Sequence, residues 1–181
     1  MVCVRPDNRF FGEKSVRLVV VLVLACLLVS CSGQENKAAL KVGDKAPDFT
    51  VTDLDGNVFS LSNYLGSPVI LRFFLTDCKF CRADTPVFNA YYTRFHSKGL
   101  RVIYIDTLGI NDQELDSFRQ ELEIVFPVAP DKGGKVAAAY SVKALPQTVV
   151  LDPQHKIIAA ILGGVSESEL KHLLSPYLSF E

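Results

Sequence analysis

The chain of 181 residues is 49% hydrophobic and 22% charged, with a formal net charge of −1 at pH 7. At roughly 100–200 residues per domain, this length predicts one compact domain, and the composition is that of a globular protein. The near-neutral charge disfavours nucleic acid as a partner, because nucleic acid binding needs a basic face. Five cysteines stand at positions 3, 26, 31, 78 and 81, and an odd number does not fit a framework of disulfides alone.

Residues 1–30 have the pattern of a secretory signal peptide. Four basic side chains precede twelve apolar residues, Leu18 to Val29. As a helix at about 1.5 Å per residue, this run would span about 18 Å against a hydrocarbon core of about 30 Å. The run is therefore too short for a transmembrane helix and fits the apolar region of a signal peptide. A marginal membrane anchor is the alternative.

The end of this segment resembles the lipobox of bacterial lipoproteins. Leu28, Val29 and Ser30 place two apolar residues and a small one directly before Cys31. The resemblance implies cleavage before Cys31, lipid on its thiol, and a location in the bacterial cell envelope that faces the periplasm or another extracytoplasmic space. Several acyl chains anchor a protein stably where one chain would be marginal. An ordinary secretory signal with a chance cysteine is the alternative.

Cleavage would leave a short tether and one domain. Residues 31–40 are small and polar and predict a flexible tether, and residues 41–181 predict the folded domain. Loss of residues 1–30 would reduce 19 basic and 20 acidic side chains to 15 and 18, a net charge of −3. Cys3 and Cys26 would leave with the signal peptide. Lipidation of Cys31 would then leave Cys78 and Cys81 as the two thiols, in an oxidising compartment.

The domain alternates strand and helix patterns. Residues 48–60 predict a hairpin around the turn Asp55-Gly56-Asn57. The run Val69 to Leu75 is apolar except for Arg72, which predicts a strand buried on both faces. Further strands are predicted at 102–105, 148–151 and 156–162, and helices at 79–96, 111–122, 134–140 and 166–177. This order predicts an α/β fold with a central mixed sheet, helices on both faces and an N-terminal β-hairpin.

The motif Cys78-Lys79-Phe80-Cys81 places two thiols at the junction of a predicted strand and a predicted helix. The unpaired N–H groups and the dipole at a helix N-terminus favour a thiolate on the first cysteine. One helical turn brings the second sulfur within reach. We therefore expect Cys78 to be the nucleophile and Cys81 to resolve the mixed disulfide. The pair would itself be the redox centre, without another cofactor.

Three alternatives use the same cysteines. A zinc site would need two more ligands, but the mature chain has no second cysteine pair, and His96, His155 and His172 stand singly. A copper site is equally weak, because the only methionine is Met1. We therefore expect no metal. A structural disulfide stays open, although so short a loop constrains the unfolded chain little.

Four segments in order resemble the thioredoxin-like superfamily, and within it the TlpA/ResA-like extracytoplasmic thiol–disulfide oxidoreductases. They are the opening VGDKAPDF at 42–49, the motif CKFC at 78–81, Pro86, and LPQT at 145–148. The resemblance covers about residues 41–178 and implies a thioredoxin-like fold. It also implies a cis peptide bond at Pro146, with the backbone of Leu145 available to pair with an extended substrate. An ordinary trans proline is the alternative.

Two positions depart from the family pattern. Asp77 stands where most relatives have tryptophan, and Arg72 stands where thioredoxins have a buried aspartate. A carboxylate at Asp77 should disfavour the Cys78 thiolate. Arg72 near the sulfurs should favour the thiolate, and no carboxylate would be there to take a proton. The alternative for Arg72 is a cation at a strand end that pairs with an acid elsewhere.

The resemblance implies a membrane-tethered enzyme that exchanges disulfides with envelope proteins. A reductant is favoured, for example in cytochrome c maturation, and it would need electrons from a membrane thiol carrier of the DsbD or CcdA type. One alternative is a peroxiredoxin-like peroxidase, but Leu71 and Leu75 stand where that family has proline and threonine. The other is a redox-inert binding or assembly lipoprotein that uses the fold as a docking surface. The cysteine pair speaks against this second alternative.

Overall fold

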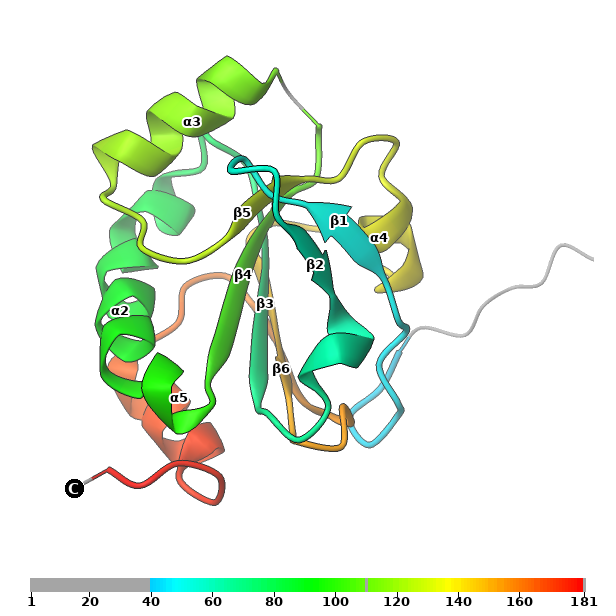
Figure 1. The fold of residues 1–181 in the computed structure, drawn as a ribbon, viewed down its shortest axis with the longest axis vertical. Coiled ribbons are helices and arrows are strands. Elements are labelled where there is room, and N and C mark those ends of the chain that lie inside the picture. The colour runs from blue at the N-terminus through cyan, green and yellow to red at the C-terminus, as the bar shows by residue number, and fades with distance from the viewer. Residues whose placement is uncertain (1–39, 110, 181) are drawn as a thin grey trace, which may run out of the picture. The chain divides into compact units, whose positions relative to one another are not determined.

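A computed structural model describes residues 40–109 and 111–180, so the predicted signal peptide and Cys31 lie outside the described residues. Figure 1 shows the arrangement of the strands and helices. The strands are β1 Thr50–Thr52, β2 Val58–Ser60, β3 Val69–Phe74, β4 Arg101–Asp106, β5 Val128–Pro130, β6 Gln147–Leu151 and β7 Ile157–Leu162. The α-helices are α2 Lys79–Phe95, α3 Asp112–Glu121, α4 Lys135–Ala139 and α5 Glu167–Leu174, and the 3-10 helices are η1 Leu61–Tyr64 and η2 His96–Lys98.

The central sheet has the strand order β5-β4-β3-β6-β7, with β3 in the middle. Strand β4 is parallel to β3 and β5, whereas β6 is antiparallel to both of its neighbours, β3 and β7. The predicted mixed sheet is therefore confirmed. All six residues of β3 are buried, as the apolar run predicted, because this strand is covered on both faces.

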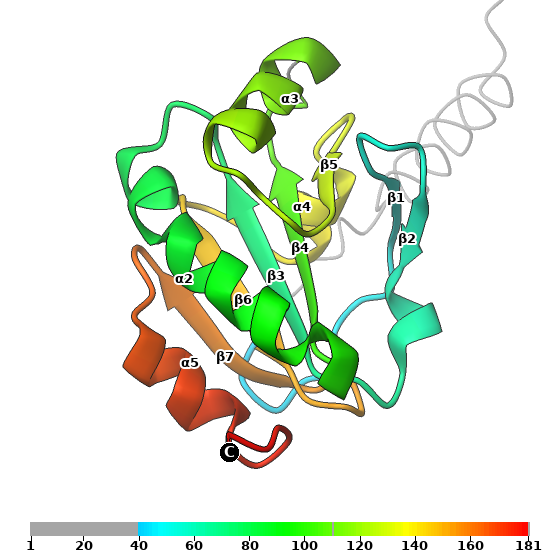
Figure 2. The ribbon, with the colours of Figure 1, turned by 60° about the vertical axis from the view of Figure 1, so that its left-hand side comes forward.

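Two apolar cores lie on opposite faces of this sheet. Side chains of a strand alternate between faces, and so Ile70 and Phe74 of β3 join the core under α2, α3 and α5. Leu71 and Phe73 join the other core, under the β1–β2 hairpin, η1 and α4. Figures 1 and 2 show α2 and α5 together on one face of the sheet and the hairpin on the other. The N-terminal hairpin thus covers part of one face of the sheet, whereas helices cover the opposite face.

Local signals in the sequence set several ends of these elements. Gly56 has a φ of +81° in the turn between β1 and β2, a conformation that favours glycine. The Asn111 side chain accepts a hydrogen bond from the Glu114 N–H at 2.8 Å and caps α3. Ser166 and Glu169 form a reciprocal capping box at the start of α5. The helices predicted from residues 111 and 166 thus begin at these caps.

Strand β5 was missing from the predicted order. It has only three residues, Val128–Pro130, and pairs with β4 at the edge of the sheet. A strand this short carries no readable alternation, and proline is ordinarily a sign against a strand except at an edge. Residues 128–130 form a strand because they pair with β4. The sequence near these residues gives no sign of this pairing.

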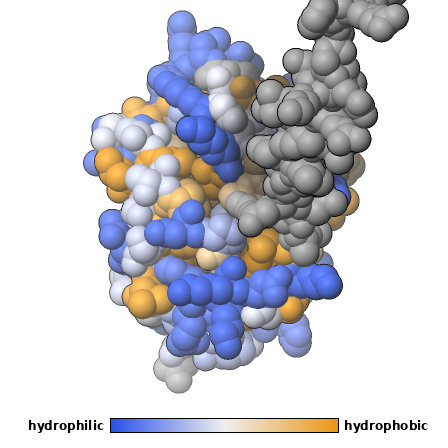
Figure 3. Space-filling view, turned by 90° about the vertical axis from the view of Figure 1, so that its right-hand side faces the viewer, coloured by the Kyte–Doolittle hydropathy of each residue, from blue (hydrophilic) through white to orange (hydrophobic). Residues whose placement is uncertain are grey.

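Within residues 40–109 and 111–180, no helix is long and apolar enough to cross a membrane. The coloured part of the face in Figure 3 has both hydrophilic and apolar patches, as is usual for the surface of a globular domain.

Candidate active site

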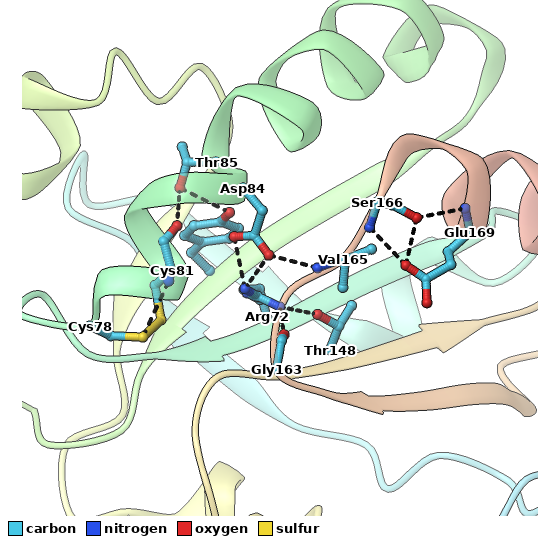
Figure 4. A network of polar contacts seen from close by, with 11 residues as sticks. Arg72, Cys78, Cys81, Asp84, Thr85, Thr148, Gly163, Val165, Ser166 and Glu169 are labelled. Carbon is cyan, nitrogen blue, oxygen red and sulfur yellow. Dashed lines mark hydrogen bonds and ion pairs between the residues drawn. A yellow bond between two sulfur atoms is a disulfide. The ribbon is translucent and has the colours of Figure 1, made fainter.

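Cys78 and Cys81 form a disulfide at the N-terminus of α2 (Figure 4). Cys78 is the N-cap residue, and its sulfur accepts a hydrogen bond from the Cys81 N–H at 3.2 Å. Cys78 is half-buried, whereas Cys81 has no exposed surface. An N–H group and a helix dipole directed at Cys78 Sγ favour its thiolate when the pair is reduced. The geometry therefore allows Cys78 to meet a partner and Cys81 to reclose the ring.

Side chains of α3 contact the turn between β3 and α2 and the first turn of α2. Thr76 Oγ1 donates to Glu114 at 3.1 Å, and the Thr76 carbonyl accepts from Arg82 Nε at 2.9 Å. Arg82 also pairs with Glu121 at 2.6 Å. The first turn of α2 is thus fixed both to the turn that precedes it and to helix α3.

Asp77, the residue before Cys78, is exposed. With Thr76, Arg82 and Glu114 it lines a pocket of about 190 Å³ between the β3–α2 turn and α3. Solvent screens an exposed carboxylate more than a buried one. The effect of Asp77 on the Cys78 thiolate stays a prediction.

The Leu145–Pro146 peptide bond is cis. Gln147 pairs with Phe73 near the end of β3. Pro146 therefore lies next to the C-terminal end of β3, where the turn to Cys78 begins. Pro146 is buried and Leu145 half-buried, and the Pro146 carbonyl accepts a hydrogen bond from the Gly163 N–H at 2.8 Å. The cis geometry agrees with the family resemblance, and binding of substrate by the Leu145 backbone stays a prediction.

Arg72 lies in the middle of β3, fully buried, and pairs with Asp84 of α2. Two hydrogen bonds from Arg72 Nη2 reach the two Asp84 carboxylate oxygens at 2.8 Å and 2.6 Å. Arg72 Nη1 donates to Thr148 Oγ1 and, at 3.1 Å, to the Gly163 carbonyl. The idea that Arg72 pairs with an acid elsewhere is confirmed, but its placement at a strand end is wrong.

The expectation that no buried carboxylate lies beside Arg72 is wrong, because Asp84 occupies this place. It is buried one helical turn beyond Cys81 and also accepts a hydrogen bond from the Val165 N–H at 2.9 Å. Burial raises the pKa of the Asp84 carboxyl above its ordinary value, although the Arg72 charge and the bond from Val165 act in the opposite direction. An ion pair therefore takes the place of the lone buried acid of thioredoxins.

Asp84 is not among the site residues predicted from the sequence, although the sequence contains a pattern that indicates it. The helical pattern from residue 79 has a buried face that includes Cys81, Asp84 and Phe88, spaced at three and four residues. An acid on an apolar helix face and an arginine in an apolar strand each need a partner. The two needs together predict that Arg72 and Asp84 pair with each other.

Among residues 40–109 and 111–180, no cluster of three or more histidine, cysteine or acidic side chains could hold a metal ion. The redox-capable group that the structure shows is the disulfide itself. A two-cysteine disulfide at the start of a helix, directly after the central strand of a mixed sheet, is typical of a thiol–disulfide oxidoreductase of thioredoxin-like fold.

Comparison with known proteins gives the same class. Residues 42–160 match the AhpC/TSA family, and the chain belongs to this family. A thiol-disulfide oxidoreductase ResA of Bacillus cereus is 32% identical over 163 residues, which cover 87% of this chain and 92% of that protein. The ResA of Geobacillus thermodenitrificans is 30% identical over 169 residues, which cover 90% and 97%.

A solved structure extends the likeness to the fold. The crystal structure of a putative thiol:disulfide interchange protein DsbE from Chlorobium tepidum aligns with a TM-score of 0.70 at 28% identity. The alignment covers 77% of this chain and 99% of that one. The chain is thus a thiol–disulfide oxidoreductase that uses a redox-active disulfide.

Proposed function

We propose that the chain is a lipid-anchored reductant of disulfides in proteins of the bacterial cell envelope. The observation that carries this proposal is the unequal burial of the two cysteines, with Cys78 half-buried at the helix N-terminus and Cys81 fully buried. Relatives named ResA and a neighbour titled DsbE support the exchange chemistry. Cytochrome c maturation is the process we propose, and proteins with thiols or disulfides are the substrates.

The reaction has two exchange steps. The Cys78 thiolate attacks one sulfur of a substrate disulfide, which forms a mixed disulfide and releases the other substrate sulfur as a thiolate. The Cys81 thiolate then attacks Cys78 Sγ, so that the second substrate sulfur leaves and the Cys78–Cys81 disulfide forms. Two electrons have passed to the substrate. A membrane thiol carrier of the DsbD or CcdA type reduces the pair again.

Lipid on Cys31 would hold the domain at the membrane that contains this carrier. The lipobox-like residues 28–31 support this part of the proposal, as does the apolar run that precedes them. The anchor and the extracytoplasmic location form one proposal, because both depend on the signal-peptide and lipobox-like patterns of residues 1–31.

Trapping of substrates tests the roles of the cysteines. A Cys81→Ser variant should accumulate mixed disulfides through Cys78, because the resolving thiol is absent, whereas Cys78→Ser should accumulate none. Diagonal electrophoresis of envelope proteins, run with and without reductant, measures both. Trapping by Cys78→Ser alone would overturn the assignment.

The reduction potential of the Cys78–Cys81 pair tests the direction of electron transfer. A reduction potential near −270 mV, about that of thioredoxin, would support a reductant, and one near −120 mV an oxidant.

A peroxidase is the second candidate, because the AhpC/TSA family matches residues 42–160. A peroxidase needs hydrogen-bond donors that position the peroxide, but Leu75 offers no hydroxyl, and Arg72 is buried in its pair with Asp84. We therefore expect the reduced chain to react with hydrogen peroxide no faster than an ordinary exposed thiol. Stopped-flow fluorescence of the tyrosines measures this rate, and a fast reaction would favour the peroxidase.

A further inference from the structure

A single buried side chain, Arg72, joins the elements around the cysteine pair. Its guanidinium donates to Asp84 of α2 at 2.8 Å and 2.6 Å, to Thr148 of β6, and to the Gly163 carbonyl, at 3.1 Å, just after β7. Arginine can do this because its planar group presents five donors in a fixed fork, whereas lysine offers a compact charge on a flexible stem. The contacts therefore depend on arginine and not only on its charge.

Gly163 extends this network to the Leu145–Pro146 segment. Its carbonyl accepts from Arg72, and its own N–H donates to the Pro146 carbonyl at 2.8 Å. The φ of Gly163 is +96°, in the left-handed region that favours glycine. Two consecutive hydrogen bonds through one residue, Gly163, thus connect Arg72 with the carbonyl of Pro146.

Asp84 connects the other end of the network to the active-site helix. It lies three residues beyond Cys81 on the buried face of α2. Its carboxylate accepts the fork of Arg72 and the N–H of Val165, which belongs to the connection between β7 and α5. Figure 4 shows Arg72 between Asp84 on one side and Thr148 and Gly163 on the other. The path from α2 to Pro146 is therefore continuous.

We propose that Arg72 is a positioning residue that holds the Leu145–Pro146 segment in place relative to Cys78 and Cys81. The inference rests on the proposed function, together with the prediction that the Leu145 backbone pairs with the substrate chain. Stability alone does not require such a pair, because replacement of a buried ion pair by well-packed apolar residues is often neutral or stabilising. Reaction geometry is more demanding, since a misplacement of about 1 Å can cost about a hundredfold in rate.

A positioning role for Arg72 affects polypeptide disulfides and small organic disulfides differently. A polypeptide disulfide needs both the sulfurs and the backbone of Leu145, because its chain pairs with that segment. A small organic disulfide needs the sulfurs alone. Displacement of the Leu145–Pro146 segment therefore slows exchange with polypeptides and leaves exchange with small disulfides nearly unchanged. A direct effect of the Arg72 charge on the cysteines would slow or speed both exchanges together.

The test compares the reduced wild-type chain with an Arg72→Lys variant in single-turnover reactions. Insulin serves as the polypeptide disulfide and bis(2-hydroxyethyl) disulfide as the small one. We expect Arg72→Lys to lower the second-order rate with insulin at least about tenfold, and to change the rate with the small disulfide by less than about twofold. The Cys78 thiol pKa, followed by thiolate absorbance, should stay unchanged, since the charge is retained.

Two further variants keep the test decisive. Thr148→Val removes one of the hydrogen bonds of Arg72 and keeps the size of the side chain, so it should lower the insulin rate in the same direction by a smaller factor, even if Arg72→Lys does not fold. Val69→Ala creates a cavity at the opposite end of β3, where Val69 is fully buried, and should leave the ratio of the two rates unchanged.

The outcomes separate the inference from the proposed function. If wild type reduces neither disulfide, the proposed function fails. If wild type reduces both and neither Arg72→Lys nor Thr148→Val changes the ratio of the rates, the positioning role is overturned. Equal losses with both disulfides, together with a shifted Cys78 pKa, would overturn it too and assign Arg72 to the electrostatics of the cysteines.

Discussion

The Asp84 carboxylate accepts a hydrogen bond from the backbone N–H of Val165 at 2.9 Å. This bond links helix α2 to the connection before α5, segments that lie 81 residues apart in the chain. The same carboxylate carries both bonds from Arg72, so Asp84 serves two parts of the fold at once. Loss of its oxygens would leave Arg72 Nη2 and the Val165 N–H without an acceptor, and the buried charge of Arg72 without its counter-ion.

Asp84→Ala should therefore destabilise the domain by about 3 kcal/mol, because an uncompensated charge is left in the core. The free energy of unfolding, measured by urea denaturation at pH 7, tests this value. The matched control is Lys132→Ala, which breaks an ion pair with Asp112 in which both side chains are more than half exposed. This control should cost less than about 1 kcal/mol. Equal losses in the two variants would contradict a structural role for the buried pair.

The start of α5 gives a prediction about pH. The Glu169 carboxylate accepts from the Ser166 hydroxyl at 2.6 Å and from the Ser166 N–H at 2.8 Å, and these bonds lower the pKa of Glu169. A lowered pKa in the folded state means that the ionised side chain stabilises the fold. This contribution is complete above the ordinary pKa of 4.5 and is lost as the pH falls through the folded value.

Glu169→Gln should therefore lower the free energy of unfolding at pH 7, and its difference from wild type should shrink as the pH falls from 5 to about 3. Ser166→Ala removes the other half of the box and should cost about 1 kcal/mol at pH 7. Urea denaturation across this range measures both effects. A difference between Glu169→Gln and wild type that is constant with pH would contradict the assignment.

Most of the fold could be predicted from local patterns, because each pattern has one physical cause. The apolar run of β3 predicts a strand covered on both faces, and the spacing of residues after Lys79 predicts α2. The position of Cys78 follows from these two elements, since it stands between them. Caps at Asn111 and Ser166 depend on contacts three residues apart, and they too could be read locally.

The Arg72–Asp84 pair could not be read in this way. Its two residues are twelve positions apart, on a strand and a helix whose relative placement depends on the whole core. A comparison of Arg72 with the buried aspartate of thioredoxins shows which residue type is replaced at that position, but it does not show which residue pairs with Arg72. The buried face of α2 would have supplied the answer, because Asp84 shares it with Cys81 and Phe88.

The lipid anchor yields the last prediction. If Cys31 carries lipid, Cys31→Ser should release the chain from the membrane fraction or leave it as an unprocessed precursor, because the acceptor thiol is gone. Ultracentrifugation of cell lysates with immunodetection measures the distribution, and metabolic labelling with a fatty acid detects the lipid directly. Cys26→Ser, which replaces another cysteine five residues earlier, is the control and should leave the chain in the membrane fraction with its label. A Cys31→Ser chain that keeps both the label and the membrane association would rule out lipid on Cys31. A wild-type chain that lies in the membrane fraction without the label would instead favour anchoring by an uncleaved apolar segment.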